Sequence, residues 1–205
     1  VLALKDRGSA FLFESVAGST MPVAANLLVS RDRFARAFGV TRASLDAHCL
    51  NALAQPVKPA MVSDAPVQAV VHDKAIDIGK LLPVPHWFER ESAPYITAGV
   101  IVAKDPQTGK RNVSIARLRL EGGNRLMAGI AKNHHLHILA EKAKALGRKL
   151  PIAVVIGNHP AVLIAAALYL KLGDDELGVA GALLGEPASL LRCRTSSLLV
   201  PANAE

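Results

Sequence analysis

Strand-like segments separated by turn signals, in the middle of the chain, place the strongest constraint on its fold. Apolar and β-branched residues dominate 99–104, 112–120 and 126–131, whereas Asp-Pro-Gln-Thr-Gly at 105–109 and Glu-Gly-Gly-Asn at 121–124 separate them. Gly, Pro, Asn and Asp in such short connections are typical of hairpin turns. The pattern therefore predicts an antiparallel meander over residues 99–131.

Helices are expected on both sides of this meander. Ser30 is a candidate N-cap for a helix that ends at Gly39, Thr41 is a candidate N-cap for the next helix, and Gly185 is a candidate end signal for a later one. Further helices are predicted at 135–146, from residue 160 onwards and at 174–184, and further strands at 11–15, 22–28, 67–72, 151–156 and 192–200. These elements predict an α+β protein.

The stretch 55–66 is the predicted domain boundary, because it contains three prolines and breaks the regular pattern on either side. It divides the chain into an N-terminal portion, 1–62, and a larger domain, 63–205.

Composition indicates a globular protein and excludes several classes. Hydrophobic residues make up 51% and charged residues 20% of the chain. The longest uncharged apolar run, 161–170, is too short for the roughly 20 residues of a membrane-spanning helix. Cys49 and Cys193 provide neither a disulfide framework nor a zinc signature. The sequence therefore predicts a soluble, cytoplasmic protein with no membrane span.

The net charge of +7 raises the alternative of a nucleic-acid partner. The basic residues are scattered, however, and those of one helix, which we interpret as a solvated face, are Lys142, Lys144, Arg148 and Lys149. Aromatic residues form only 4% of the chain, too few for a base-stacking platform. We expect no nucleic-acid partner, and the positive charge suits a phosphate and a carboxylate substrate better.

The run Asn112-Val-Ser-Ile-Ala-Arg117 places polar groups inside an apolar strand. Strand alternation would point Asn112 and Ser114 to one face and Arg117 to the other. Taken alone, an ordinary strand with a surface arginine explains this run. Other residues strengthen a functional interpretation.

Candidate metal ligands begin two of the predicted helices. His134, His135 and His137 lie at the start of one, and Asp174-Asp175-Glu176 lies at the start of another. Together with an amide oxygen, these groups suit a hard or borderline divalent ion such as Mn²⁺ or Mg²⁺. A polar helix start is the simpler explanation of the histidines, and favourable charge at a helix N-terminus is that of the acids. Both alternatives stay open on the residues alone.

Three motifs occur in an order that resembles the UbiD family of decarboxylases. They are Asn112-Val-Ser-Ile-Ala-Arg117, Glu176-Leu-Gly-Val-Ala-Gly-Ala182, and Leu190-Leu-Arg-Cys193 followed by Val200-Pro-Ala-Asn-Ala-Glu205. The resemblance extends upstream through Phe11-Leu-Phe-Glu-Ser-Val-Ala-Gly18 and covers nearly the whole chain. It implies a flavin-binding split β-barrel domain over 63–205, preceded by a small α/β portion over 1–62, both incomplete.

The resemblance implies a prenylated FMN cofactor whose phosphate is tied to the protein by a divalent metal, usually Mn²⁺. The implied metal ligands are Asn112, His135 and Glu176. The residues implied to line the cofactor are Ser114, Ile115, Ala116, Arg117, Gly129, Ile130, Ala131, His134 and His135. His134 departs from the family, in which this position varies between glutamine, arginine and others. A monovalent cation such as K⁺ is implied at backbone groups around Ala165 to Leu168.

The implied reaction is the non-oxidative, reversible decarboxylation of an unsaturated or aromatic carboxylic acid. Arg117 would be catalytic, holding the substrate carboxylate in a bidentate fork that lysine reproduces poorly. The expected partner is this small-molecule acid, and the full-length protein is expected to be a homo-oligomer.

Two family acids that form a network with this arginine are expected beyond Glu205, together with a domain that closes over the substrate. We therefore expect the 205 residues alone to be inactive as a decarboxylase. The alternative function is a non-catalytic flavin-binding or partner module derived from the same family.

Overall fold

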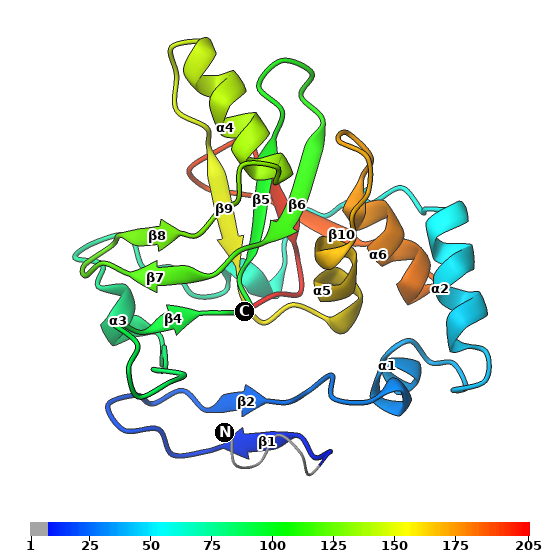
Figure 1. The fold of residues 1–205 in the computed structure, drawn as a ribbon, viewed down its shortest axis with the longest axis horizontal. Helices are drawn as coiled ribbons and strands as arrows, with labels where there is room; N and C mark the ends of the chain where they lie inside the picture. Colours follow the sequence, from blue (N-terminus) through cyan, green and yellow to red (C-terminus); the bar gives the residue numbers. More distant parts are fainter. Residues whose placement is uncertain (1–7) are drawn as a thin grey trace. The chain divides into compact units, whose positions relative to one another are not determined.

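The computed structural model describes residues 8–205, which form two compact units that interleave along the chain (Figure 1). Unit 1 takes its described residues from Val1–Leu45, Val71–Thr97 and Arg117–Ala128, and unit 2 consists of Asp46–Val70, Ala98–Ala116 and Gly129–Glu205. Small sheets and separate helices confirm the predicted α+β class. The division along the chain at residues 62 and 63 stays a prediction.

Unit 1 begins with a hairpin and a short helix. Strands β1 (Phe11–Phe13) and β2 (Val23–Ala25) form within the two predicted segments 11–15 and 22–28, and they pair antiparallel. Helix α1 (Arg31–Ala37) follows, and the Ser30 side chain accepts a hydrogen bond from the Arg33 amide at 3.4 Å. Ser30 is therefore the N-cap, as expected.

A three-stranded antiparallel sheet forms the other part of unit 1. Its strands are β4 (Tyr95–Ile96), β7 (Leu118–Leu120) and β8 (Leu126–Ala128), with β7 in the centre. Helix α3 (Ile78–Leu81) precedes this sheet in the chain, and the Asp77 side chain caps it.

The principal sheet of unit 2 has the order β6-β5-β9 and is antiparallel throughout. Its strands are β5 (Val100–Lys104), β6 (Arg111–Ile115) and β9 (Ile152–Val155). The first four residues of β5 are completely buried. Both faces of this central strand therefore contribute to the core, so its sequence is continuously apolar rather than alternating.

Three helices of unit 2 contact strand β6: α4 (His135–Ala145), α5 (Pro160–Ala167) and α6 (Glu176–Leu184). Figure 1 shows α4 running alongside the β5–β6 hairpin. Helix α6 ends at Gly185, whose φ of 77° is left-handed and explains the predicted end signal. The helix starts of α4 and α6 are therefore brought to the same strand.

The other described elements of unit 2 are a helix, a 3-10 turn and a second sheet. Helix α2 (Leu45–Ala54) and the 3-10 helix η2 (Pro66–Gln68) flank the short strand β3 (Ala60–Met61) in the chain. Strand β3 pairs parallel with β10 (Ser189–Arg192), which pairs antiparallel with β11 (Leu199–Pro201). Among residues 8–205, no helix is long and apolar enough to cross a membrane.

Several predictions differ from the structure in extent or kind. The segment 112–120 is two strands, because β6 pairs with β5 whereas β7 pairs with β4 and β8. Residues 192–200 span a hairpin between β10 and β11 instead of one strand. Residues 67–72 contain part of η2 and no strand. Thr41 does not cap α2: its hydroxyl accepts from the Ser44 amide in a turn before the helix.

Candidate functional site

Asn112 of β6 and Glu176 of α6 meet in the interior of unit 2. Asn112 Nδ2 donates to Glu176 Oε1 at 3.0 Å, and the Val113 amide donates to Glu176 Oε2 at 2.9 Å. Asn112 and Glu176 are each only 2% exposed. A buried carboxylate is costly unless it is hydrogen-bonded or paired, and here both of its oxygens accept a hydrogen bond.

A second contact between the same elements lies one residue before the first. Arg111 Nε and Nη2 donate to Asp175 Oδ1 and Oδ2 at 3.0 and 2.7 Å, which is a bidentate ion pair. Asp175 also caps α6, because its Oδ1 accepts from the Leu177 amide at 3.2 Å. Asp175 therefore fixes the start of the helix, and the next residue carries the buried carboxylate.

Burial raises the pKa of Glu176 to about 7, and the neighbouring charge of Asp175 acts in the same direction. The hydrogen bonds from the Val113 amide and from Asn112 oppose this shift. The carboxyl is thus poised between its neutral and ionised forms at neutral pH. A nearby cation would favour the ionised form.

His135, the first residue of α4, brings an imidazole to this pair. Its Nδ1 lies 3.4 Å from Asn112 Nδ2. The preceding His134 caps the helix, with its Nδ1 accepting from the Leu136 amide at 3.3 Å. Burial, followed by the adjacent His135, lowers the pKa of His134, so its neutral form is favoured. Of the three histidines at this helix start, only His135 has a described contact with Asn112.

The residue types of this cluster could hold a metal ion if the amide oxygen of Asn112 faced it. Asn112 Oδ1 and Ser114 Oγ are buried without a hydrogen-bond partner among the described residues. A buried oxygen without a partner is a place where an ordered water or an ion can bind. Within residues 8–205 no three His, Cys, Asp or Glu side chains form a metal cluster, but here the third donor is an amide. Amide, imidazole and carboxylate together form a donor set that suits Mn²⁺ or Mg²⁺.

The other predicted cofactor residues occupy two segments next to these ligands in the chain. Ser114 and Ile115 end β6, and Ala116 follows the strand. Gly129, Ile130 and Ala131 form the connection from β8 to α4, and the Ala131 carbonyl accepts from the His134 amide at 3.0 Å. The backbone groups predicted to bind K⁺, around Ala165 to Leu168, lie at the end of α5. The Ala165 carbonyl accepts from the Leu168 amide at 3.2 Å, and the K⁺ site stays a prediction.

Arg117 lies between β6 and β7 and belongs to unit 1. Its Nη2 donates to Glu91 Oε1 at 2.5 Å, and its guanidinium lies 4.4 Å from the centroid of the Tyr95 ring. Because the strand ends at Ile115, the alternation used to orient Arg117 does not extend to this residue.

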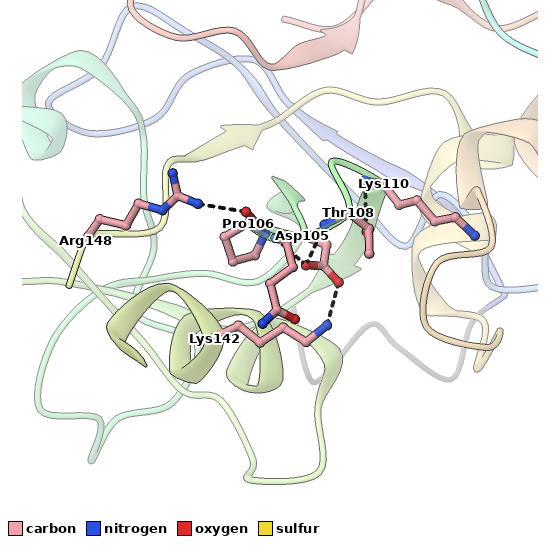
Figure 2. A network of polar contacts seen from close by, with 7 residues as sticks. Asp105, Pro106, Thr108, Lys110, Lys142 and Arg148 are labelled. Atoms are coloured by element: carbon pink, nitrogen blue, oxygen red, sulfur yellow. Dashed lines mark hydrogen bonds and ion pairs between the residues drawn. The ribbon is translucent and has the colours of Figure 1, made fainter. Parts of the chain in front are cut away.

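Sequence reasoning missed the role of Lys142. Figure 2 shows this side chain reaching from α4 to Asp105 in the β5–β6 turn, where Nζ lies 2.6 Å from Asp105 Oδ2. Arg148 donates to the Pro106 carbonyl of the same turn at 2.8 Å. The interpretation of this basic helix face as merely solvated is therefore wrong for Lys142, which pairs with a buried acid. The turn signal pointed to Asp105, but nothing local pointed to its partner.

Two family models match the sequence. The 3-octaprenyl-4-hydroxybenzoate carboxy-lyase Rift-related domain, UbiD, matches residues 60–205, and the N-terminal domain of the same carboxy-lyase, UbiD_N, matches residues 2–53. Together they match most of the chain.

Similar proteins include decarboxylases. Anhydromevalonate phosphate decarboxylase of Methanosarcina mazei is 34% identical over 98% of this chain and 45% of its own length. Pyrrole-2-carboxylic acid decarboxylase of Pseudomonas aeruginosa is 35% identical over 74% of this chain and 31% of its own. The structure of an evolved dimeric form of the UbiD-class enzyme HmfF from Pelotomaculum thermopropionicum, in complex with prFMN, is similar with a TM-score of 0.94 and 40% identity. That likeness covers 99% of this chain and 48% of the HmfF chain, so this chain spans less than half the length of these relatives.

Proposed function

Because the chain belongs to the UbiD family of carboxy-lyases, we propose that it forms the flavin-binding part of a decarboxylase that acts on an unsaturated or aromatic carboxylic acid. The reaction would be non-oxidative and reversible. The observation that carries the proposal is the meeting of Asn112, His135 and Glu176, from three separate segments, at the amide nitrogen of Asn112. The oxygen of the same amide is buried without a hydrogen-bond partner among the described residues. A similar protein is a UbiD-class enzyme in complex with prFMN, which supports the same cofactor here.

Asn112, His135 and Glu176 would hold a divalent ion, Mn²⁺ by preference, that binds the phosphate of the cofactor. Glu176 would be ionised in that complex, since a cation at hydrogen-bond distance offsets the burial that raises the pKa of this carboxyl to about 7. The helix start of α4 carries one of the ligands, and unsatisfied amides at a helix start also favour phosphate.

The residues next to the ligands in sequence, together with His135 itself, would line the cofactor. In the first segment these are Ser114, Ile115, Ala116 and Arg117; in the second they are Gly129, Ile130, Ala131, His134 and His135. Prenylated FMN, when bound, supplies the electron sink for the loss of CO₂. A K⁺ ion at the carbonyls around Ala165 to Leu168 belongs to the same proposal.

Arg117 would bind and orient the substrate carboxylate. Its planar guanidinium presents N–H groups in a fork that matches a carboxylate, and its charge is permanent. The Tyr95 ring and the Glu91 carboxylate already fix two sides of this group. The active protein would be a homo-oligomer, which a dimeric form among the similar structures supports.

The test uses the longest natural chain that contains these 205 residues, reconstituted with prenylated FMN, Mn²⁺ and K⁺, because the 205 residues alone are expected to be inactive. Flavin retention is followed by ultraviolet-visible absorption, and CO₂ release is followed with cinnamic, 4-hydroxybenzoic and pyrrole-2-carboxylic acids. We expect flavin to be retained with Mn²⁺ and to be lost with EDTA or in the N112A variant. Flavin retention that is indifferent to Mn²⁺, to EDTA and to N112A would contradict the metal-dependent cofactor site. Flavin retention without CO₂ release from any acid would favour the non-catalytic module.

A further inference from the structure

The connection between α3 and β4 delivers a carboxylate to the guanidinium of Arg117. From the contacts of this segment we infer that Glu91 is a positioning residue, which together with the Tyr95 ring sets the orientation in which Arg117 presents its N–H fork to a substrate carboxylate. The inference rests on the proposed function, in which Arg117 binds that carboxylate.

Glu91 is itself held in place by its own loop. Its Oε2 accepts from the Trp87 amide at 2.8 Å and from the Phe88 amide at 3.4 Å. The Glu91 amide in turn donates to the Phe88 carbonyl at 3.1 Å. These bonds close a turn around the carboxylate and leave Oε1 for Arg117. The side chain of Glu91 is only 12% exposed, whereas that of Arg117 is 53% exposed. The buried Glu91 therefore orients the more exposed Arg117.

Tyr95 contributes the second constraint. Its ring lies under the guanidinium at 4.4 Å, within the range of a cation–π contact. The ring position is set by the backbone, because Tyr95 lies in β4 opposite Arg119 of β7. The Tyr95 carbonyl also accepts from Trp87 Nε1 at 2.9 Å, which ties the ring-bearing strand to the turn that holds Glu91. One edge and one face of the guanidinium are therefore defined by a single connected segment.

The arrangement leaves donors for a second carboxylate. A guanidinium has five N–H groups, and the contact with Glu91 uses the Nη2 nitrogen. A bidentate substrate contact needs two parallel N–H groups, which the fork still offers. Glu91 thus fixes the plane of the fork without saturating it.

The charge state of Glu91 favours positioning over proton donation. Burial raises the pKa of Glu91, but the amide donors of Trp87 and Phe88 and the guanidinium of Arg117 outweigh it, so this pKa lies below its ordinary value. A carboxyl that stays ionised at neutral pH is a poor general acid. The same ionised group is a suitable permanent partner for arginine.

The catalytic test compares E91Q with E89Q in the flavin-loaded enzyme, on the best substrate of the three acids above. Glutamine keeps the size of Glu91 and an acceptor oxygen but removes the charge, and Glu89 is an exposed acid of the same segment. We expect E91Q to raise KM for the acid about 10-fold with a change in kcat below about 3-fold, and E89Q to change neither by more than about 2-fold. Flavin absorption should be the same in all three proteins. Unchanged KM in E91Q would overturn the inference.

Two further measurements separate positioning from general stabilisation. In an R117K background, E91Q should raise KM by less than about 2-fold, because the effects of substitutions at residues that act together are not additive. Likewise Y95L should raise KM and Y95F should not, since phenylalanine keeps the ring. An E91Q effect of equal size in the R117K background would show that Glu91 acts independently of Arg117, against the inference.

A measurement without turnover distinguishes this inference from the proposed function. In ¹³C-labelled protein, the R117M variant should raise the pKa of the Glu91 carboxyl toward its ordinary value, as read by carboxyl NMR. If the pKa of Glu91 is the same in R117M as in the natural protein, the positioning contact is overturned. Full decarboxylase activity in R117M overturns the proposed function instead.

Discussion

Arg111 and Asp175 form a bidentate ion pair one residue away from the contact between Asn112 and Glu176, so two adjacent links join strand β6 to the start of helix α6. The outer link is charged and partly exposed, and the inner link is buried. The outer pair therefore fixes the register in which the inner pair meets.

Breaking the outer link should destabilise unit 2. The variant R111M leaves the Asp175 carboxylate without its partner, and we expect a loss of about 1–3 kcal/mol in the free energy of unfolding. The matched control is R42M, which removes the exposed Arg42–Asp32 pair and should cost less than about 1 kcal/mol. Urea denaturation followed by circular dichroism measures both. Equal losses in the two variants would contradict a special role for Arg111.

The raised pKa of Glu176 predicts a pH dependence of the metal-free protein. Between its ordinary value of 4.5 and its folded value of about 7, the folded state binds more protons than the unfolded state, so stability falls as pH rises. Glutamine at this position cannot ionise. The stability of E176Q relative to the natural protein should therefore increase by on the order of 3 kcal/mol between pH 4.5 and pH 8. Thermal unfolding in EDTA across this range provides the measurement, and parallel curves for the two proteins would refute the burial argument.

Addition of Mn²⁺ should make the natural protein more stable than E176Q at pH 8, because only the carboxylate provides an anionic ligand. At a free ion concentration of about 100 times Kd, a native-state ligand adds about 2.7 kcal/mol. We expect the natural protein to gain stability with Mn²⁺ at pH 8, and N112A and E176Q to gain much less. N51A, which changes an exposed asparagine of α2, serves as the control and should respond like the natural protein. A full Mn²⁺ response in N112A would remove the amide from the ligand set.

The Asp105–Lys142 contact of Figure 2 should be worth more than an ordinary surface pair. Asp105 is buried and accepts from the Gln107 and Thr108 amides as well as from Lys142. We expect K142M to lower the free energy of unfolding by about 2–3 kcal/mol, since a buried acid loses its partner. K144M removes a largely exposed lysine from the same helix and should stay within about 0.5 kcal/mol. Chemical denaturation of both variants decides this.

The same acid gives a second pH dependence. Burial raises the pKa of Asp105, but the Lys142 ammonium and the turn amides outweigh it, so this pKa lies below its ordinary value. The stabilising contribution of the ionised acid is therefore present above the ordinary pKa of aspartate and is lost as pH falls through the depressed value. The stability difference between the natural protein and D105N should shrink on acidification below about pH 4. A stability difference that stays constant down to pH 2 would contradict this stabilising role of the ionised Asp105.

The sequence allowed good prediction where the signal is local. Ser30 and Gly185 mark helix ends because caps and left-handed glycines depend on their immediate neighbours. Pairing partners are not local, which is why the run 112–120 looked like one strand: its alternation continues while the partner changes from β5 to β4 and β8.

The site was predictable in part for the same reason. Asn112 and Glu176 were suspected from their residue types, their motifs and the resemblance, and the structure places them in contact. Glu91 had no signal, since a single glutamate in an irregular segment looks like a surface residue. Its importance depends on Arg117, which is 26 residues away in the chain.

The pairing of β3 with β10 has a consequence for synthesis on the ribosome. Ala60 lies opposite Ser189, so nearly 130 further residues must be translated after β3 before its partner strand exists. At about 5–20 residues per second this delay is roughly 6–25 s, far longer than a hairpin needs to form. The nascent chain therefore carries β3 without its partner strand throughout that interval.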